Sequence, residues 1–128
     1  MAGVALAALE ALQYRDQMSK RMTAEKALQA AEDSEDGQYG VLLENGSMEL
    51  GYYRPIGSDD QQPHEQDEIY IVRSGSGTFV RGEETIVFEP GDALFVAAHV
   101  EHRFTDFSND FAAWVVFYGP EGGETCDS

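Results

Sequence analysis

The spacing of apolar residues changes once along the chain, near residue 37. Residues 4–32 contain neither Pro nor Gly and are rich in Ala, Leu, Glu, Gln, Lys and Met, which is the composition of a helical region. Thr23 is a plausible N-cap for a helix that runs to Ala31, so one long helix or two shorter ones are both compatible with this region. The polar residues 33–37 then end the helical pattern.

After residue 37 the apolar positions recur with a period of two. Short segments rich in β-branched and aromatic residues alternate with turn residues, which is typical of strands. The expected strands are 39–43, 47–54, 68–73, 78–81, 85–88, 93–97, 102–107 and 112–118. Asn45-Gly46 and Pro90-Gly91 are turn signals between them. Because no helical segment separates the strands, we expect a mainly antiparallel sheet closed into a sandwich or a small barrel.

Composition limits the classes of partner. The chain has 128 residues, which is the length of one domain, and 42% of them are hydrophobic, so a packed core is expected. Only 8 Lys and Arg stand against 24 Asp and Glu, and the formal net charge is -16. A surface this acidic repels nucleic acid and anionic lipid, so neither is an expected partner.

Cysteine content and hydropathy indicate a protein of the cytoplasm. Cys126 is the only cysteine, so no intrachain disulfide can form. The apolar start of the chain lacks a basic region and is interrupted by Glu10, which argues against a signal peptide. No run of 18 apolar residues is present to span a membrane.

One expected strand places a carboxylate among apolar side chains. Alternation puts Glu68, Tyr70 and Val72 on one face of the strand and the isoleucines at 69 and 71 on the other. A carboxylate on an apolar face must be paired, hydrogen-bonded or bound to a metal, because burying it alone is costly. His102 lies on the same strand face as Phe104 and is the natural candidate for its partner.

The residues around Glu68 resemble the first motif of the cupin superfamily, and the resemblance extends over residues 46–120. That motif has two histidines one residue apart, a glutamate three or four residues later, and a glycine further on. Here His64 lies four residues before Glu68, and Gly75 follows seven residues after it. Gln62 stands in the place of the first histidine.

The second cupin motif is present in part. Its glycine and its metal-binding histidine correspond to Gly91 and His102. Ala97, His99 and Asp106 stand where the family has a proline, an inner glycine and an asparagine. His99 therefore takes a turn position and is interpreted as a loop residue near the site.

The resemblance implies a fold and a ligand set. The fold would be an all-β, cupin-type double-stranded β-helix, or jelly-roll barrel, with an N-terminal helical segment. The ligands of a divalent metal, Fe, Mn, Ni, Co or Zn, would be His64, Glu68 and His102, with Gln62 in the fourth place. A glutamine oxygen is a neutral and weaker ligand, and Gln66 remains an alternative to Gln62.

Three aromatic residues are candidates for contact with a substrate. Tyr70 shares a strand face with Glu68 and is expected to line the pocket. Tyr52 or its neighbour Tyr53 is expected at the barrel mouth, and Trp114 lies either in the core or against the bound molecule. No residue is assigned a catalytic role.

The predicted organisation has three parts: a helical segment (1–36), a cupin barrel (37–120) and a flexible C-terminal tail (121–128). The resemblance is to small single-domain bacterial cupins of unassigned role, so the expected function is that of a metal-binding protein acting on a small polar molecule, as an oxygenase, isomerase or lyase. The alternatives are a non-catalytic ligand-binding or sensory cupin with a degenerate metal site, and a structural or partner-binding role. A homodimer is expected, formed through sheet faces or the N-terminal helix.

Overall fold

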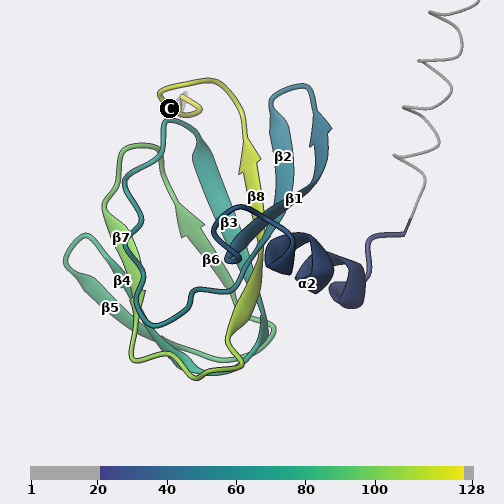
Figure 1. Cartoon of the computed structure of the whole chain (residues 1–128). Helices are drawn as coiled ribbons and strands as arrows, with labels where there is room; N and C mark the ends of the chain where they lie inside the picture. The colour runs from purple at the N-terminus through teal and green to yellow at the C-terminus, as the bar shows by residue number, and fades with distance from the viewer. Residues whose placement is uncertain (1–20, 126–128) are drawn as a thin grey trace, which may run out of the picture.

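The computed structural model describes residues 21–125, in which a helix precedes eight strands (Figure 1). The elements are α2 (Ala24–Glu32), β1 (Tyr39–Asn45), β2 (Met48–Tyr53), β3 (Asp67–Ser74), β4 (Gly77–Arg81), β5 (Glu84–Phe88), β6 (Ala93–Val96), β7 (His102–Thr105) and β8 (Ala112–Tyr118). The predicted strands are confirmed, with ends that differ by at most two residues. The predicted helical positions before residue 21 lie outside the described residues.

Helix α2 begins where the sequence predicts. Thr23 is in an extended conformation and its hydroxyl accepts a hydrogen bond from the backbone N–H of Lys26 at 3.2 Å, which satisfies one of the free donors of the first turn. Ala27 and Ala31 are fully buried against the sheet. The approach is so close that a Cβ atom on Gly40 of β1 would collide with the helix backbone.

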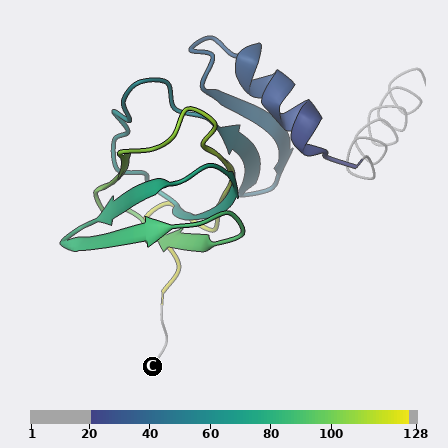
Figure 2. The same ribbon diagram turned by 90° about the horizontal axis from the view of Figure 1, so that it is seen from below.

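All strand pairs are antiparallel, and they form two sheets. The larger has the order β1-β2-β8-β3-β6 and the smaller β5-β4-β7. The two sheets face each other around the core, and α2 covers the outer side of the larger sheet, away from the smaller one (Figure 2). This is the antiparallel β-barrel that the sequence predicts.

The larger sheet is covered on both faces near β2. Its inner face packs against the smaller sheet in a core that contains Tyr53, Tyr70, Val72, Phe79, Phe88, Leu94, Val96, Phe104, Phe111, Ala113 and Val115. Its outer face contributes Tyr52 and Trp114 to a second cluster beneath α2. The adjacent residues Tyr52 and Tyr53 thus project from opposite faces of the sheet, as the alternation of strand side chains requires.

The end of the chain returns to the barrel as far as it is described. The backbone N–H of Gly122 donates to the carbonyl of Glu65 at 2.6 Å, and that of Glu124 donates to Oδ2 of Asp67 at 2.8 Å. These bonds attach the start of the predicted tail to the residues around the beginning of β3. Within residues 21–125 no helix is long and apolar enough to cross a membrane.

Candidate metal centre

Three elements bring His64, Glu68 and His102 together at one end of the barrel. Glu68 is the second residue of β3, His102 is the first residue of β7, and His64 lies in the loop before β3. Nε2 of His102 is 3.2 Å from Oε1 of Glu68, and Nε2 of His64 is 3.9 Å from the same oxygen. One ligand atom from each residue falls within 4.8 Å of the others, so a single ion can contact all three.

Glu68 is the most constrained member of the group. Its side chain is 1% exposed, and neither carboxylate oxygen makes a hydrogen bond. A buried carboxylate without hydrogen bonds is costly unless a cation compensates it. The position therefore favours either a protonated histidine or a metal ion beside Glu68.

A backbone carbonyl orients the imidazole of His102. Nδ1 lies 2.9 Å from the carbonyl oxygen of Val100, and because a carbonyl only accepts, Nδ1 carries the proton of this bond. In the neutral ring, Nε2 then carries a lone pair. This nitrogen lies 3.2 Å from Oε1 of Glu68 and 3.1 Å from the hydroxyl of Tyr70. A metal-binding histidine is commonly held in this way, by a hydrogen bond from its other nitrogen.

The pKa values of the two histidines are shifted in opposite directions. Burial lowers the pKa of His64, with the charge of Glu68 opposing this effect and His102 adding to it. Burial also opposes the charged form of His102, but the Glu68 carboxylate beside Nε2 and the Val100 carbonyl at Nδ1 prevail and raise its pKa. The lowered pKa of His64 favours its neutral, metal-binding form, whereas the raised pKa of His102 favours a protonated ring beside Glu68.

A buried carboxylate positions the polar side chains beside this group. Asp59 accepts hydrogen bonds from the hydroxyl of Tyr53 at 2.7 Å, the backbone N–H of Phe104 at 2.8 Å, and Nε2 of Gln61 at 2.8 Å. Oε1 of Gln61 in turn accepts from the hydroxyl of Tyr70 at 2.8 Å. Both ends of the Gln61 amide are therefore fixed, and its oxygen lies 3.4 Å from Nε2 of His64.

The amide near the ligands is that of Gln61. The side chain of Gln62, which the family spacing places fourth among the ligands, is exposed. The amide nitrogen of Gln66 donates hydrogen bonds to the carbonyls of Ser47 and Gly119 at 2.7 and 2.9 Å. These bonds join the β1–β2 hairpin to the end of β8. Sequence reasoning missed Asp59 and Gln61, because no pattern distinguishes them from their identical neighbours at 60 and 62.

The three aromatic candidates for substrate contact lie on two different faces of the larger sheet. Tyr70 is fully buried with its hydroxyl beside His102, and burial followed by the charge of Glu68 raises its pKa well above the usual range. Tyr52 and Trp114 lie on the opposite face of the sheet, beneath α2, with ring centroids 5.2 Å apart. They cannot reach an ion at His102 from there, because the sheet itself lies between.

Two departures from the second motif occupy turn conformations. His99 and Asp106, at the positions of the family glycine and asparagine, have φ of 69° and 50°, in the left-handed region that these family residues favour. The backbone at both positions therefore adopts a conformation that glycine and asparagine favour, although the residues differ. The His99 side chain is 57% exposed and lies 3.7 Å from a carboxylate oxygen of Glu65.

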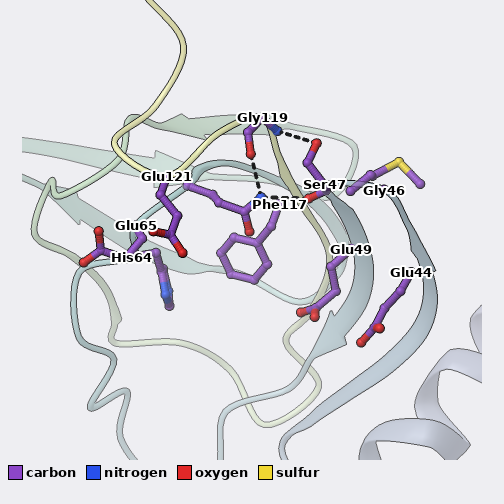
Figure 3. Close-up of a pocket in the computed structure, with 11 residues that line it drawn as sticks. Glu44, Gly46, Ser47, Glu49, His64, Glu65, Phe117, Gly119 and Glu121 are labelled. Atoms are coloured by element: carbon purple, nitrogen blue, oxygen red, sulfur yellow. Dashed lines mark hydrogen bonds between the residues drawn. The ribbon is translucent and has the colours of Figure 1, made fainter.

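The ligand group opens to solvent through His64. This residue lines a cavity of about 600 Å³ between the β1–β2 hairpin and the end of β8 (Figure 3), and also a neighbouring cavity of about 390 Å³. The ring of Phe117 packs edge-on against His64, with centroids 4.8 Å apart, and lines both cavities. A molecule in either cavity would meet His64 before Glu68 or His102.

The donor set fits a divalent transition metal. Two imidazoles and one carboxylate hold such an ion while leaving positions open for water or substrate. The buried carboxylate of Glu68, which makes no hydrogen bond, is the feature of the structure that such an ion would compensate. Fe, Mn, Ni, Co and Zn all bind this combination of ligands.

The chain thus folds as a small antiparallel β-barrel with two histidines and a glutamate inside one end, a group that could hold a metal ion. The family model described as Cupin domain matches residues 51–118, which is more than half of the chain. The protein therefore belongs to the cupin family.

The chain is also similar to individual proteins. An uncharacterized protein of Streptomyces coelicolor is 38% identical over 96 residues, which cover 73% of this chain and 91% of that protein. The crystal structure of a candidate mannose-6-phosphate isomerase from Ralstonia eutropha is similar with a TM-score of 0.51 and 26% identity, covering 64% of this chain and 83% of the other. A DMSP lyase, with a TM-score of 0.55 and 24% identity over 65% of this chain and 47% of its own, shares the fold.

Proposed function

We propose that this cupin binds a divalent metal through His64, Glu68 and His102 and acts there on a small polar molecule. The observation that carries the proposal is the buried carboxylate of Glu68, which has no hydrogen bond and two imidazole nitrogens within 3.9 Å. A cation bound by all three residues would remove the cost of this arrangement.

The bound ion would supply Lewis acidity, polarising an oxygen of the substrate, and the classes of reaction open to it are those of an oxygenase, isomerase or lyase. The chain itself supplies the surroundings. The buried hydroxyl of Tyr70 stays protonated, because burial and the charge of Glu68 raise its pKa, and it is held by Gln61. Its single proton is directed to Gln61, so the phenol stays neutral and its oxygen can accept a hydrogen bond next to the ligands.

Similarity to an enzyme supports action on a small polar molecule. The Ralstonia eutropha protein, described as a candidate isomerase of mannose 6-phosphate, is 26% identical to this chain. Its substrate is a small polar molecule, and the cavities beside His64 are large enough for such a molecule. The proposal extends to this class of molecule and not to the phosphosugar itself.

Metal content tests the proposal directly. The purified protein is expected to contain or take up one divalent ion per chain, measured by elemental analysis after dialysis against each metal. His64→Ala and His102→Ala should each lose most of the bound ion, whereas His99→Ala is the matched control, since His99 is exposed and outside the ligand group. The same low metal content in the wild type and in all three variants would rule the site out.

A non-catalytic ligand-binding or sensory cupin is the second candidate function. It is favoured by the exposed side chain of Gln62, which stands where the cupin motif has a histidine. A metal-loaded protein that binds small molecules but turns none of them over would support this candidate against the enzyme.

We further propose a homodimer formed through the outer face of β3 and β6. Ile71 and Phe95 are large apolar residues of this face with 41% and 44% exposure, and α2 packs on β1 and β2 instead. Sedimentation velocity should give the mass of two chains, and Phe95→Glu should reduce it to the mass of one. A wild-type protein that sediments as a single chain contradicts the proposal.

A further inference from the structure

Hydrogen bonds fix which end of the Gln61 amide faces the candidate ligands. Nε2 of Gln61 donates to Oδ2 of Asp59 at 2.8 Å, and because an ionised carboxylate only accepts, the amide oxygen must lie at the other end. Oε1 accepts from the hydroxyl of Tyr70 at 2.8 Å and lies 3.4 Å from Nε2 of His64. The amide oxygen, and not the amide nitrogen, is therefore directed to the side of the ligand group.

The oxygen of Gln61 has a second lone pair on this side. An amide oxygen has two lone pairs, and the hydroxyl of Tyr70 uses one of them. The contact with Nε2 of His64, at 3.4 Å, is longer than the range of about 2.7 to 3.2 Å for an N–H···O hydrogen bond. The same nitrogen of His64 lies 3.9 Å from Oε1 of Glu68. The amide oxygen thus faces the space that an ion bound by the ligand group would share.

Asp59 ties this amide to the strand that carries His102. Oδ2 of Asp59 accepts from the backbone N–H of Phe104 at 2.8 Å, and Phe104 follows His102 by two residues in β7. Oδ1 of Asp59 accepts from the backbone N–H of Gln61 at 3.2 Å. The amide is therefore held beside the ligands by the protein itself, and a donor that is fixed in advance loses little conformational freedom on binding.

We infer that Oε1 of Gln61 is a fourth protein ligand of the ion, beside the two histidines and the glutamate. The donor set then consists of two imidazole nitrogens, one carboxylate oxygen and one amide oxygen, which suits a divalent transition metal. Gln62, which the motif spacing places fourth, has an exposed side chain. This inference rests on the proposed function and adds a residue of this chain to the same site.

Titration of the full-length wild type with Zn²⁺, followed by NMR, tests the inference without any substitution. Binding of the amide oxygen to an ion draws electron density from the amide nitrogen, so the side-chain amide signals of Gln61 should move as Zn²⁺ is added. The corresponding signals of Gln62 should stay in place and serve as the internal control. Unchanged Gln61 signals in a protein that takes up Zn²⁺ would overturn the inference.

Two substitutions of Gln61 separate a ligand from a structural support. Gln61→Leu removes both ends of the amide, whereas Gln61→Glu keeps an oxygen but loses the N–H bond to Asp59. A ligand role predicts that the leucine variant binds Zn²⁺ about tenfold or more weakly. It also predicts that the glutamate variant binds at least as tightly as the wild type, because a charged oxygen replaces a neutral one. Competition with a chromophoric chelator measures both affinities.

The same substitutions at Gln62 are the matched controls, since this residue is adjacent and exposed. Gln62→Leu should leave the affinity for Zn²⁺ unchanged, and Gln62→Glu measures the effect of an added charge that does not touch the ion. If Gln61→Glu binds Zn²⁺ as weakly as Gln61→Leu, the amide acts only as a support and the inference is wrong. Equal effects at the two positions would also contradict it.

Zinc content of the same samples separates this inference from the proposed function. A wild type that binds Zn²⁺, together with a Gln61→Leu variant of equal affinity, overturns the inference and leaves the site of His64, Glu68 and His102 standing. A wild type that takes up neither Zn²⁺ nor another divalent ion overturns the proposed function, and the inference with it.

Discussion

The hydroxyl of Tyr70 donates a hydrogen bond to Oε1 of Gln61 at 2.8 Å and so joins the interior of β3 to the loop that carries His64. The same hydroxyl lies 3.1 Å from Nε2 of His102. One phenol thus contacts Gln61 and His102 at the candidate metal centre, and its removal tests how far the proposed ligands depend on their surroundings.

Tyr70→Phe keeps the buried ring and removes this hydroxyl. We expect the free energy of unfolding to fall by about 1 to 2 kcal/mol, because the partly buried amide oxygen of Gln61 loses its donor. Metal affinity should fall about tenfold or more, because His64 and His102 lose a neighbour that orders them. Urea unfolding and metal titration measure the two effects. Tyr118→Phe, outside this network, is the control, and equal losses in both variants would contradict the assigned role.

Glu68→Gln should abolish stabilisation by metal. An ion at 100 times its dissociation constant stabilises the folded protein by about 2.7 kcal/mol if it binds only the folded state. The variant keeps the shape of the side chain but loses the charge that attracts the ion, so its unfolding midpoint should not respond to added metal. Thermal unfolding with and without the ion provides the measurement.

The control for Glu68→Gln is Glu83→Gln, which removes an exposed carboxylate from the β4–β5 turn. This variant should respond to metal as the wild type does. A metal-dependent rise in midpoint that survives in Glu68→Gln would place the ion elsewhere in the protein.

Asp59→Ala should be among the most destabilising changes in the loop before β3. Asp59 is 5% exposed and accepts from Tyr53, Phe104 and Gln61. Its loss leaves buried donors without acceptors, for an expected decrease in unfolding free energy of about 3 kcal/mol. Asp60→Ala, at the exposed neighbour, should change stability by less than about 0.5 kcal/mol. Chemical denaturation of both variants tests whether stability depends on the buried hydrogen-bond acceptor or only on a negative charge in this loop.

Alkaline pH should destabilise the protein partly through Tyr53. Burial, then the hydrogen bond and charge of Asp59, raise its pKa above the usual 10.0. The folded state therefore holds the phenol proton more tightly than the unfolded state, so this stability is fully present below about pH 10 and is lost as the pH rises further. Tyr53→Phe should reduce the slope of stability against pH above pH 10 by at most about 1.4 kcal/mol per pH unit. Identical slopes in the two proteins would count against this coupling.

The strands and the inward residues of β3 follow from the sequence because their environment is simple. The inner face of β3 lies in the core, and the alternation of Glu68, Tyr70 and Val72 with more exposed neighbours records this directly. The N-cap at Thr23 is equally local, since a single hydroxyl and the N–H three residues later define it. Such features depend on contacts between near neighbours or on one repeated pattern.

Other features depend on contacts that no local pattern encodes. Both faces of β2 are covered, so Tyr52 and Tyr53 are both buried, and hydrophobicity cannot tell which of them faces the barrel interior. Gln61 lies in a loop without periodicity, and its position is set by Asp59, which is anchored in turn to Phe104 in a distant strand. Family spacing selects Gln62, whereas long-range hydrogen bonds bring the amide of Gln61 to the ligands.

The three candidate ligands differ sharply in exposure: the side chains of Glu68 and His102 are 1% exposed and that of His64 is 32% exposed. An incoming ion would lose its hydration shell in stages, with His64 as the first protein donor and the two buried ligands last. Exchange kinetics would then be governed by rotation of one imidazole, so that substitutions around His64 would change the residence time of the ion more than its equilibrium affinity.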